Sequence, residues 1–188
     1  MRVRQMSEHP TTPGRASPLA LDALQDALPS PSSWVVRFAP LIASGASVLD
    51  YACGSGRHAR WLAGRGLQVD AVDRDRSALD RLQGLTGVRV RELDLEADTW
   101  PLAGERFDAM LALLQAGGVL IYETFMVGNE RFGKPSSPAF LLQPGELLER
   151  LRDGWSVVAF EQGEVVAPRP AAVQRVCAVK GSRISRLP

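Results

Sequence analysis

Apolar, strand-like runs alternate with amphipathic, helix-like stretches from about residue 32 to residue 180. The apolar runs have the length of buried strands, whereas the stretches between them repeat apolar residues at helical spacing. A chain that alternates strand and helix in this way builds βαβ units, and these predict a parallel, doubly wound α/β sheet. We expect strands over 47–50, 67–72, 88–93, 119–123, 155–160 and 173–179, and helices over 34–38, 58–63, 77–83 and 144–151.

The two ends of the chain lack this alternation. The first 30 residues are rich in proline and small polar residues, and only 19–28 has the pattern of a short helix. We therefore expect a mobile N-terminal tail over 1–30, one domain over 31–180 and a C-terminal tail over 181–188. No apolar stretch follows the positive charges of the first residues, so we expect no secretory signal.

Composition places the chain among ordinary soluble globular proteins. Its 188 residues include 22 basic and 21 acidic side chains, and the net charge of +1 argues against nucleic acid as a partner. The longest apolar runs, such as 117–121, are too short to span a membrane. Two cysteines, Cys53 and Cys177, are too few for a disulfide framework or a four-cysteine zinc site. We expect a reduced, cytoplasmic protein without a metal, and the sequence indicates no oligomeric state.

The strongest chemical signal is a glycine-rich turn between the first strand and the first long helix. The strand leads through Asp50 into Tyr51-Ala52-Cys53-Gly54-Ser55-Gly56, and Asp73 ends the next strand. Glycines at such a turn let a nucleotide approach the backbone closely. Because ligands of open α/β sheets bind at the carboxyl ends of the strands, we expect a nucleotide site here.

Two cofactors fit this turn. The run Gly54-Ser55-Gly56-Arg57-His58-Ala59 satisfies the G-x-G-x-x-A fingerprint of dinucleotide sites, which predicts an NAD(P)-dependent oxidoreductase. The carboxylate of Asp50, however, would repel a pyrophosphate on the helix N-terminus. S-adenosylmethionine has no phosphate and carries an ammonium group that a carboxylate attracts, so Asp50 favours this cofactor. A non-catalytic nucleotide-binding protein is a third interpretation.

In these residues the chain resembles the class I S-adenosylmethionine-dependent methyltransferases, and among them the small bacterial tellurite-resistance-type methyltransferases. The resemblance extends over about residues 34–179. The first motif of the family has the form hydrophobic-hydrophobic-acid-x-G-x-G-x-G, and Ala52 stands here at the first glycine. The resemblance implies a Rossmann-like sheet with a last antiparallel strand, S-adenosylmethionine as cofactor, S-adenosylhomocysteine as product and a small-molecule methyl acceptor.

The resemblance also implies which residues hold the cofactor. The first motif would lie against its methionine end, Asp73 would bond both ribose hydroxyls, and Asp94 would meet the adenine amino group. We interpret Cys53 as a small filler rather than a nucleophile, and His58 as a helix-surface or capping residue rather than a cofactor contact. The implied cofactor-binding residues are Asp50, Ala52, Gly54, Gly56, Asp73, Asp94 and Leu95.

Candidate acceptor-side groups follow the strand over 119–123. Methyl transfer is a direct displacement at a sulfonium carbon, so the enzyme contributes mainly alignment, and a base is needed only where the acceptor loses a proton. We assign no catalytic residue. The candidates are Glu123 at the end of the strand, and Asn129 and Arg131 in the loop 128–135, whose polar and glycine-rich composition suits a lid.

One span is too short for this architecture. A strand of about five residues and a helix of about eleven are expected over 107–116, which holds only ten residues. The resembling proteins have roughly a dozen more residues here, a normal length for a βαβ crossover. We place the loss between Ala109 and Met110. Either the protein contains residues that the sequence leaves out, or a real deletion truncates the central strand and damages the acceptor pocket.

Overall fold

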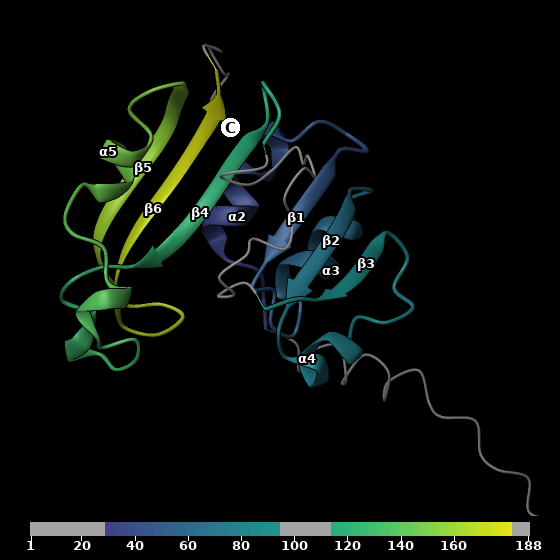
Figure 1. Cartoon of the computed structure of the whole chain (residues 1–188), viewed down its shortest axis with the longest axis horizontal. Coiled ribbons are helices and arrows are strands. Elements are labelled where there is room, and N and C mark those ends of the chain that lie inside the picture. The colour runs from purple at the N-terminus through teal and green to yellow at the C-terminus, as the bar shows by residue number, and fades with distance from the viewer. Residues whose placement is uncertain (1–28, 95–113, 182–188) are drawn as a thin grey trace, which may run out of the picture.

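The strands that the structure describes form two sheets that lie side by side (Figure 1). The computed structural model describes residues 29–94 and 114–181. The first sheet is parallel, in the order β1-β2-β3, and in the second β6 lies between β4 and β5. The strands are β1 (Ser47–Tyr51), β2 (Gln68–Asp73), β3 (Val88–Glu92), β4 (Val119–Phe125), β5 (Trp155–Val165) and β6 (Ala171–Lys180).

The register of these strands confirms the predicted α/β class with a last antiparallel strand. Ser47 of β1 pairs with Gln68 of β2, and Val69 of β2 pairs with Val88 of β3, both in parallel. Strand β6 runs antiparallel to both β4 and β5. Within the described ranges, no ladder joins β1 to β4. The expected break between Ala109 and Met110 lies outside the described residues, as do the segments 1–28 and 182–188.

Short helices connect the strands, and their ends follow local capping chemistry. The expected helix over 77–83 begins at Arg76, because the Asp75 side chain caps it, and ends at Asp80. The expected helix over 144–151 begins only after Gly145, whose φ of 77° is left-handed. The α-helices of the described residues are α2 (Ser33–Phe38), α3 (Arg57–Ala63), α4 (Arg76–Asp80) and α5 (Glu146–Arg150). The 3₁₀ turns are η1 (Ala39–Leu41), η2 (Asn129–Arg131) and η3 (Pro138–Phe140).

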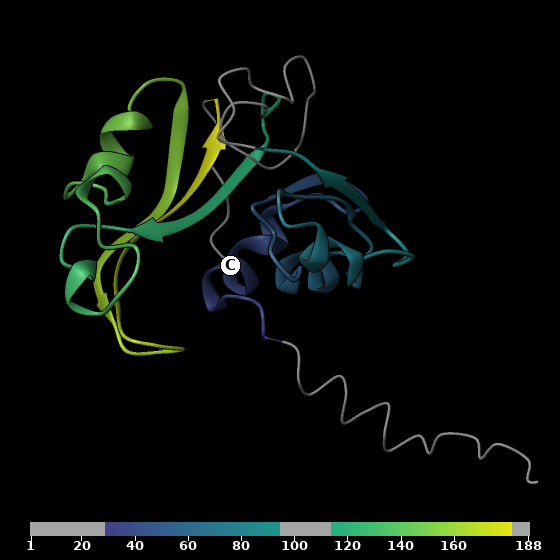
Figure 2. The ribbon, with the colours of Figure 1, turned by 60° about the horizontal axis from the view of Figure 1, so that its bottom comes forward.

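Helix α2 joins the two sheets. It packs against β4, and both views place it at the seam between β4 and the parallel strands (Figures 1 and 2). The rings of Trp34 and Phe38 meet edge to face with centroids 4.6 Å apart, and both side chains are buried. The Trp34 indole Nε1 donates to the carbonyl of Val176 on β6 at 3.2 Å. Burial of two aromatic side chains and a satisfied indole hold α2 over the seam.

None of the helices in residues 29–94 and 114–181 has the length and apolar content that crossing a membrane requires.

Candidate functional site

The glycine turn lies where β1 ends and α3 begins, as the sequence predicts. Ala52, Gly54 and Gly56 all have left-handed backbones, with φ of 52°, 53° and 76°. Among the described residues, Ala52 is the one non-glycine residue with a positive φ. The Cys53 amide donates to the carbonyl of Val72 at 3.0 Å, which ties the turn to β2. The backbone therefore needs glycine at alternate positions, and Ala52 adopts the same conformation at a steric cost.

The two glycines of the turn have different surroundings. A Cβ at Gly56 would lie 2.3 Å from Cδ2 of Leu82, so this glycine is required by the packing of the core. A Cβ at Gly54 would meet nothing within 4 Å. The open side of the turn at Gly54 therefore leaves room for a ligand to approach the backbone.

Asp73 meets the turn directly. Its Oδ2 accepts a hydrogen bond from the Gly54 amide at 2.8 Å, and its Oδ1 accepts one from the Asp75 amide at 2.9 Å. The structure thus brings together the acid and the glycine turn that the sequence singled out. Each carboxylate oxygen has a second lone pair, so Asp73 can hold the loop and still accept hydrogen bonds from a ligand.

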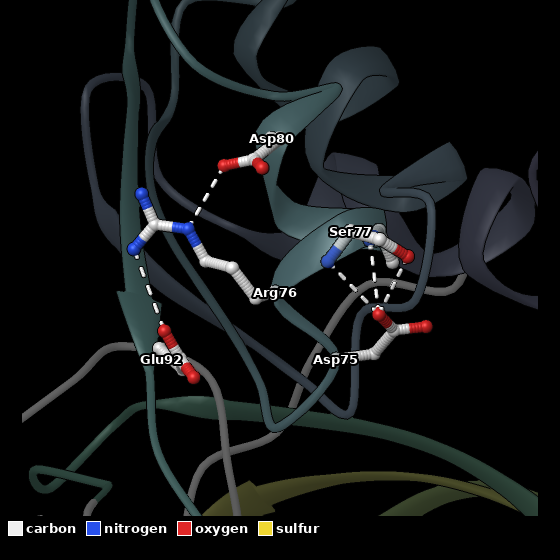
Figure 3. Close-up of polar contacts among 6 residues, drawn as sticks. Asp75, Arg76, Ser77, Asp80 and Glu92 are labelled. Atoms are coloured by element: carbon white, nitrogen blue, oxygen red, sulfur yellow. Dashed lines mark hydrogen bonds and ion pairs between the residues drawn. The ribbon is translucent and has the colours of Figure 1, made fainter.

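The loop after Asp73 is held by the start of α4 (Figure 3). Oδ1 of Asp75 accepts from the Ser77 hydroxyl at 2.8 Å, the Ala78 amide at 3.2 Å and the Ser77 amide at 2.9 Å, and these hydrogen bonds, the hydroxyl's most of all, lower the pKa of Asp75. Arg76 pairs with Asp80 at 2.9 Å and with Glu92 of β3 at 3.4 Å, and the contacts with Asp80 raise its pKa most. Contacts within the chain therefore fix this wall of the site.

Asp50, the acid before the turn, is buried against the start of α3. Its Oδ2 accepts from the Ala59 amide at 2.9 Å, and its Oδ1 lies 3.8 Å from Nδ1 of His58. Nε2 of His58 accepts a hydrogen bond from the Ser32 amide at 3.2 Å. The sequence predicted a surface or capping role for His58, whereas the structure places its ring between Asp50 of β1 and Ser32, the N-cap of α2.

Asp50, His58 and Ser32 line a cavity of about 180 Å³ between β1 and β4. Apolar side chains of α2, β1 and β4 form most of its walls, including Val35, Val48 and Leu120. Its polar lining groups are Ser32, Asp50, Tyr51, Arg57, His58, Tyr122 and Glu123. Of these, the sequence had singled out Asp50 and Glu123 for the site, so the cavity joins one implied cofactor residue to one acceptor-side candidate.

Glu123 is paired with an arginine that the sequence did not single out. Nε of Arg175 on β6 lies 2.5 Å from Oε2 of Glu123, and its Nη1 lies 3.8 Å from Oε2 of Glu161 on β5. Glu123 and Arg175 are directly opposite in the antiparallel ladder, as are Arg175 and Glu161. Because this row depends on the register of three strands, no local sequence signal could have revealed it.

The other two acceptor-side candidates lie away from the cavity. Asn129 is buried; its Oδ1 accepts from the Ala172 amide at 3.2 Å, and its Nδ2 donates to the Pro135 carbonyl at 3.0 Å. The exposed Arg131 pairs with Glu164 at 2.6 Å. Both side chains hold the loop 128–135 against β5 and β6, and neither lines the cavity with Glu123.

The adenine side of the implied site is described in part. The Leu93 amide donates to the carbonyl of Asp73 at 3.0 Å, which brings the end of β3 beside the end of β2. Asp94 follows directly and is exposed. Leu95 lies outside the described residues. The implied residues of β2 and β3 thus stand at neighbouring strand ends.

Both cysteines are buried and free. Burial is the largest cause of the raised pKa of each thiol, about 12 for Cys53 and about 12 for Cys177, and Asp50 and Asp73 raise that of Cys53 further. A neutral, buried thiol is a poor nucleophile and a poor metal ligand. Among the residues that the structure describes, no group of three or more His, Cys, Asp or Glu side chains is arranged to hold a metal ion.

Comparison with known proteins identifies the fold. Residues 48–119 match the family model described as a methyltransferase domain. TehB from Haemophilus influenzae superposes with a TM-score of 0.62 at 19% identity, over 78% of this chain and 61% of that one. The chain therefore shares the fold of these methyltransferases. An S-adenosylmethionine-dependent methyltransferase from Mesorhizobium loti superposes with a TM-score of 0.57 at 19% identity, over 85% of this chain and 96% of that one.

A third similar structure of the methyltransferase fold was solved with a ligand. The glycopeptide N-methyltransferase MtfA, in complex with S-adenosyl-L-homocysteine, superposes with a TM-score of 0.55 at 16% identity, over 87% of this chain and 98% of that one. No curated protein sequence matches the chain. The resemblance to class I methyltransferases is confirmed at the level of the fold, and the chain spans about three fifths of the length of TehB.

Proposed function

We propose that this protein binds S-adenosylmethionine at the ends of β1, β2 and β3 and methylates a small acceptor in the cavity between β1 and β4. The observation that carries the proposal is the place of Asp50. Its carboxylate bonds the Ala59 amide inside the first turn of α3. A negative charge therefore already occupies the helix N-terminus on which a dinucleotide would place its pyrophosphate.

The same carboxylate suits the methionine end of S-adenosylmethionine, which carries an ammonium group and no phosphate. Arg57, at the start of α3 and on the wall of the same cavity, supplies a cation for the carboxylate of that methionine. The open face of Gly54 leaves space for the ligand, and Asp73 beside it has acceptor positions for two ribose hydroxyls. The residues present thus fit the cofactor from its methionine end to its ribose.

S-adenosylmethionine supplies an electrophilic methyl group when it is bound. The chain's own contribution is to align an acceptor with that group and to exclude water from it. Glu123, held by Arg175 on the β4 wall of the cavity, offers a carboxylate that can orient an acceptor or take its proton. We therefore place the acceptor between Glu123 and the glycine turn, and we keep Asn129 and Arg131 as holders of the neighbouring loop.

Two further observations support this assignment. MtfA, which shares the fold, was solved with S-adenosyl-L-homocysteine, the product that any S-adenosylmethionine-dependent methyl transfer leaves behind. The cavity of about 180 Å³ has the scale of a small acceptor rather than of a macromolecule. The two free cysteines support a reducing, cytoplasmic location.

Thermal unfolding with added ligand tests the cofactor. S-adenosylhomocysteine at about 100 times its Kd should stabilise the protein by about 2.7 kcal/mol, a rise in Tm of several degrees. NAD should leave Tm unchanged because Asp50 repels its pyrophosphate. A rise with NAD and none with S-adenosylhomocysteine would reverse the assignment and favour an oxidoreductase.

Turnover is tested separately from binding. The protein is incubated with S-adenosylmethionine and a panel of small thiols, amines, alcohols and metalloid oxyanions, and formation of S-adenosylhomocysteine is followed by mass spectrometry. Product that depends on one acceptor class identifies the substrate. Cofactor binding without product from any acceptor would favour the non-catalytic nucleotide-binding protein instead.

A further inference from the structure

His58 contacts two elements that lie far apart in the sequence. Its Nε2 accepts the backbone hydrogen of Ser32 at 3.2 Å, across a separation of 26 residues. Its Nδ1 lies 3.8 Å from Oδ1 of Asp50 on β1. The imidazole ring is 23% exposed and the Asp50 side chain 9%. One partly buried ring therefore stands between the start of α2 and the carboxylate that we assign to the cofactor.

The hydrogen bond from Ser32 decides which ring nitrogen carries the proton. Because Nε2 is the acceptor, it has no proton in this arrangement, and a neutral ring then carries its proton on Nδ1. Nδ1 is the ring nitrogen on the side of Asp50, 3.8 Å from its Oδ1. The ring thus accepts a hydrogen bond from the start of α2 and lies beside the carboxylate on β1.

The contact with Ser32 shapes the mouth of the cavity. Ser32 and Val35 line the cavity together with Asp50 and His58. Ser32 is the N-cap of α2, and its side chain accepts from the Trp34 amide. Trp34 anchors the next turn of the helix to β6 through Val176. The backbone amide of Ser32 donates to His58, which is 26 residues away in the sequence. The ring therefore holds this end of α2 over the cavity.

We propose that His58 is a positioning residue that couples the closure of this end of α2 to cofactor binding at Asp50. This inference rests on the proposed function, because the ammonium group of the cofactor is the charge that would approach Asp50. A cation held by Asp50 would lie beside the ring whose Nε2 accepts from Ser32, so one side chain would contact both the bound group and the start of α2. The charged groups that share the cavity with the ring are Asp50 on β1, Arg57 on α3 and Glu123 on β4. Coupling is reciprocal, so the contact with Ser32 in turn favours the bound cofactor.

A matched pair of substitutions at position 58 tests the role of the ring. His58→Leu removes the acceptor, whereas His58→Gln keeps one, and the two replacements have similar helix propensity. S-adenosylhomocysteine should bind His58→Leu about three- to tenfold more weakly than the native protein, as expected for one lost hydrogen bond, and His58→Gln should restore most of the affinity. Amide exchange of Ser32, followed by NMR, should slow on ligand binding in the native protein and in His58→Gln, but not in His58→Leu.

A second pair tests the same contact from the side of α2. Ser32 has a φ of −57°, which proline adopts, so Ser32→Pro removes the donated hydrogen without a change of φ and places its Cδ toward the His58 ring. Ser32→Ala removes only the hydroxyl and keeps that hydrogen. Ser32→Pro should therefore bind S-adenosylhomocysteine more weakly than Ser32→Ala, and this difference should vanish in a His58→Ala background, which has no ring for either group to meet.

The outcomes separate the inference from the proposed function. If the native protein binds S-adenosylhomocysteine but affinity and Ser32 exchange are the same in His58→Leu, the coupling is wrong and the proposed function stands. If Ser32→Pro and Ser32→Ala differ equally with and without His58, the contact does not carry the effect. If the native protein does not bind S-adenosylhomocysteine at all, both the function and the coupling fail.

Discussion

Gly56 lies so close to Leu82 that a Cβ at position 56 would come within 2.3 Å of the leucine Cδ2. Leu82 is fully buried, and it follows α4, the helix that packs beside β2. Gly54, two residues earlier in the same turn, has no atom within 4 Å of its own Cβ position. One turn therefore contains a glycine that the core requires and a glycine whose open face suits a ligand.

Alanine substitutions should separate these two glycines. Gly56→Ala should lower the free energy of unfolding by about 2–5 kcal/mol, because a clash with Leu82 adds to the cost of a left-handed alanine. Gly54→Ala should cost about 1–2 kcal/mol for the left-handed backbone alone, and it should also weaken S-adenosylhomocysteine binding. Urea unfolding and calorimetric titration measure the two effects. Equal losses of stability would show that Leu82 moves aside without cost.

Ala52→Gly should stabilise the protein. Ala52 has a φ of 52°, which costs an alanine about 1–2 kcal/mol and a glycine almost nothing. Part of this gain is lost because glycine makes the unfolded chain more flexible, so we expect a net gain of about 0.5–1 kcal/mol in urea unfolding. Ala63→Gly, in the helical backbone of α3, is the matched control and should destabilise by up to about 1 kcal/mol. A loss at both positions would contradict the strain at Ala52.

Asp73→Ala should weaken the binding of S-adenosylhomocysteine by roughly 1–3 kcal/mol, the usual loss for hydrogen bonds to a charged group. Titration calorimetry measures this loss, and urea unfolding accounts for the hydrogen bond that Asp73 also makes with the Gly54 amide. Asp80→Ala removes an exposed carboxylate that pairs with Arg76 within α4 and should leave the affinity unchanged. An unchanged affinity in Asp73→Ala would remove this residue from the site.

Asn129→Ala should lower stability by about 1–3 kcal/mol, because it leaves the buried Ala172 amide and Pro135 carbonyl without their partner. Arg131→Ala should change stability by less than about 1 kcal/mol, since its pair with Glu164 is exposed on both sides. Urea unfolding compares the two. A normal stability of Asn129→Ala together with lost turnover would return Asn129 to the acceptor side of the site.

The raised pKa values of the two thiols predict their behaviour with pH. Both values are about 12 in the folded protein, against an ordinary value of 9.0, so the thiols stay protonated and iodoacetamide at pH 8.5 should not modify them until the protein unfolds. Above pH 9 the unfolded chain loses these protons first. Stability should therefore fall as pH rises from 9 to 12, by about 1 kcal/mol per thiol at pH 10.

A double variant isolates this effect from other groups that titrate at high pH. In Cys53→Ala/Cys177→Ala the fall in stability between pH 8 and pH 10, measured by urea unfolding, should be about 2 kcal/mol smaller than in the native protein. Identical pH profiles, or alkylation of the folded protein within minutes, would show that the thiols are more accessible than their burial indicates.

Much of the fold and part of the site could be predicted because their causes are local. Apolar alternation predicted β1, β2 and β3, and the glycines predicted a turn that must adopt positive φ. Asp73 could be placed beside Gly54 because parallel strands carry their carboxyl ends to one edge of the sheet. The helix boundaries were less accurate, since single capping residues such as Asp75 and Gly145 decide them.

The remaining site contacts depend on register and packing between distant segments. Arg175 meets Glu123 because β6 pairs antiparallel with β4 in one particular register, and a shift of one residue would turn the two side chains to opposite faces. His58 meets Ser32 because α2 crosses the seam, and Asn129 is buried because its loop packs on β6. Local patterns contain no information on such pairings. The sequence by itself therefore determined the residue types and the chemistry of the turn. The packing of the two sheets and α2 decided which partners Glu123, Asn129 and His58 have.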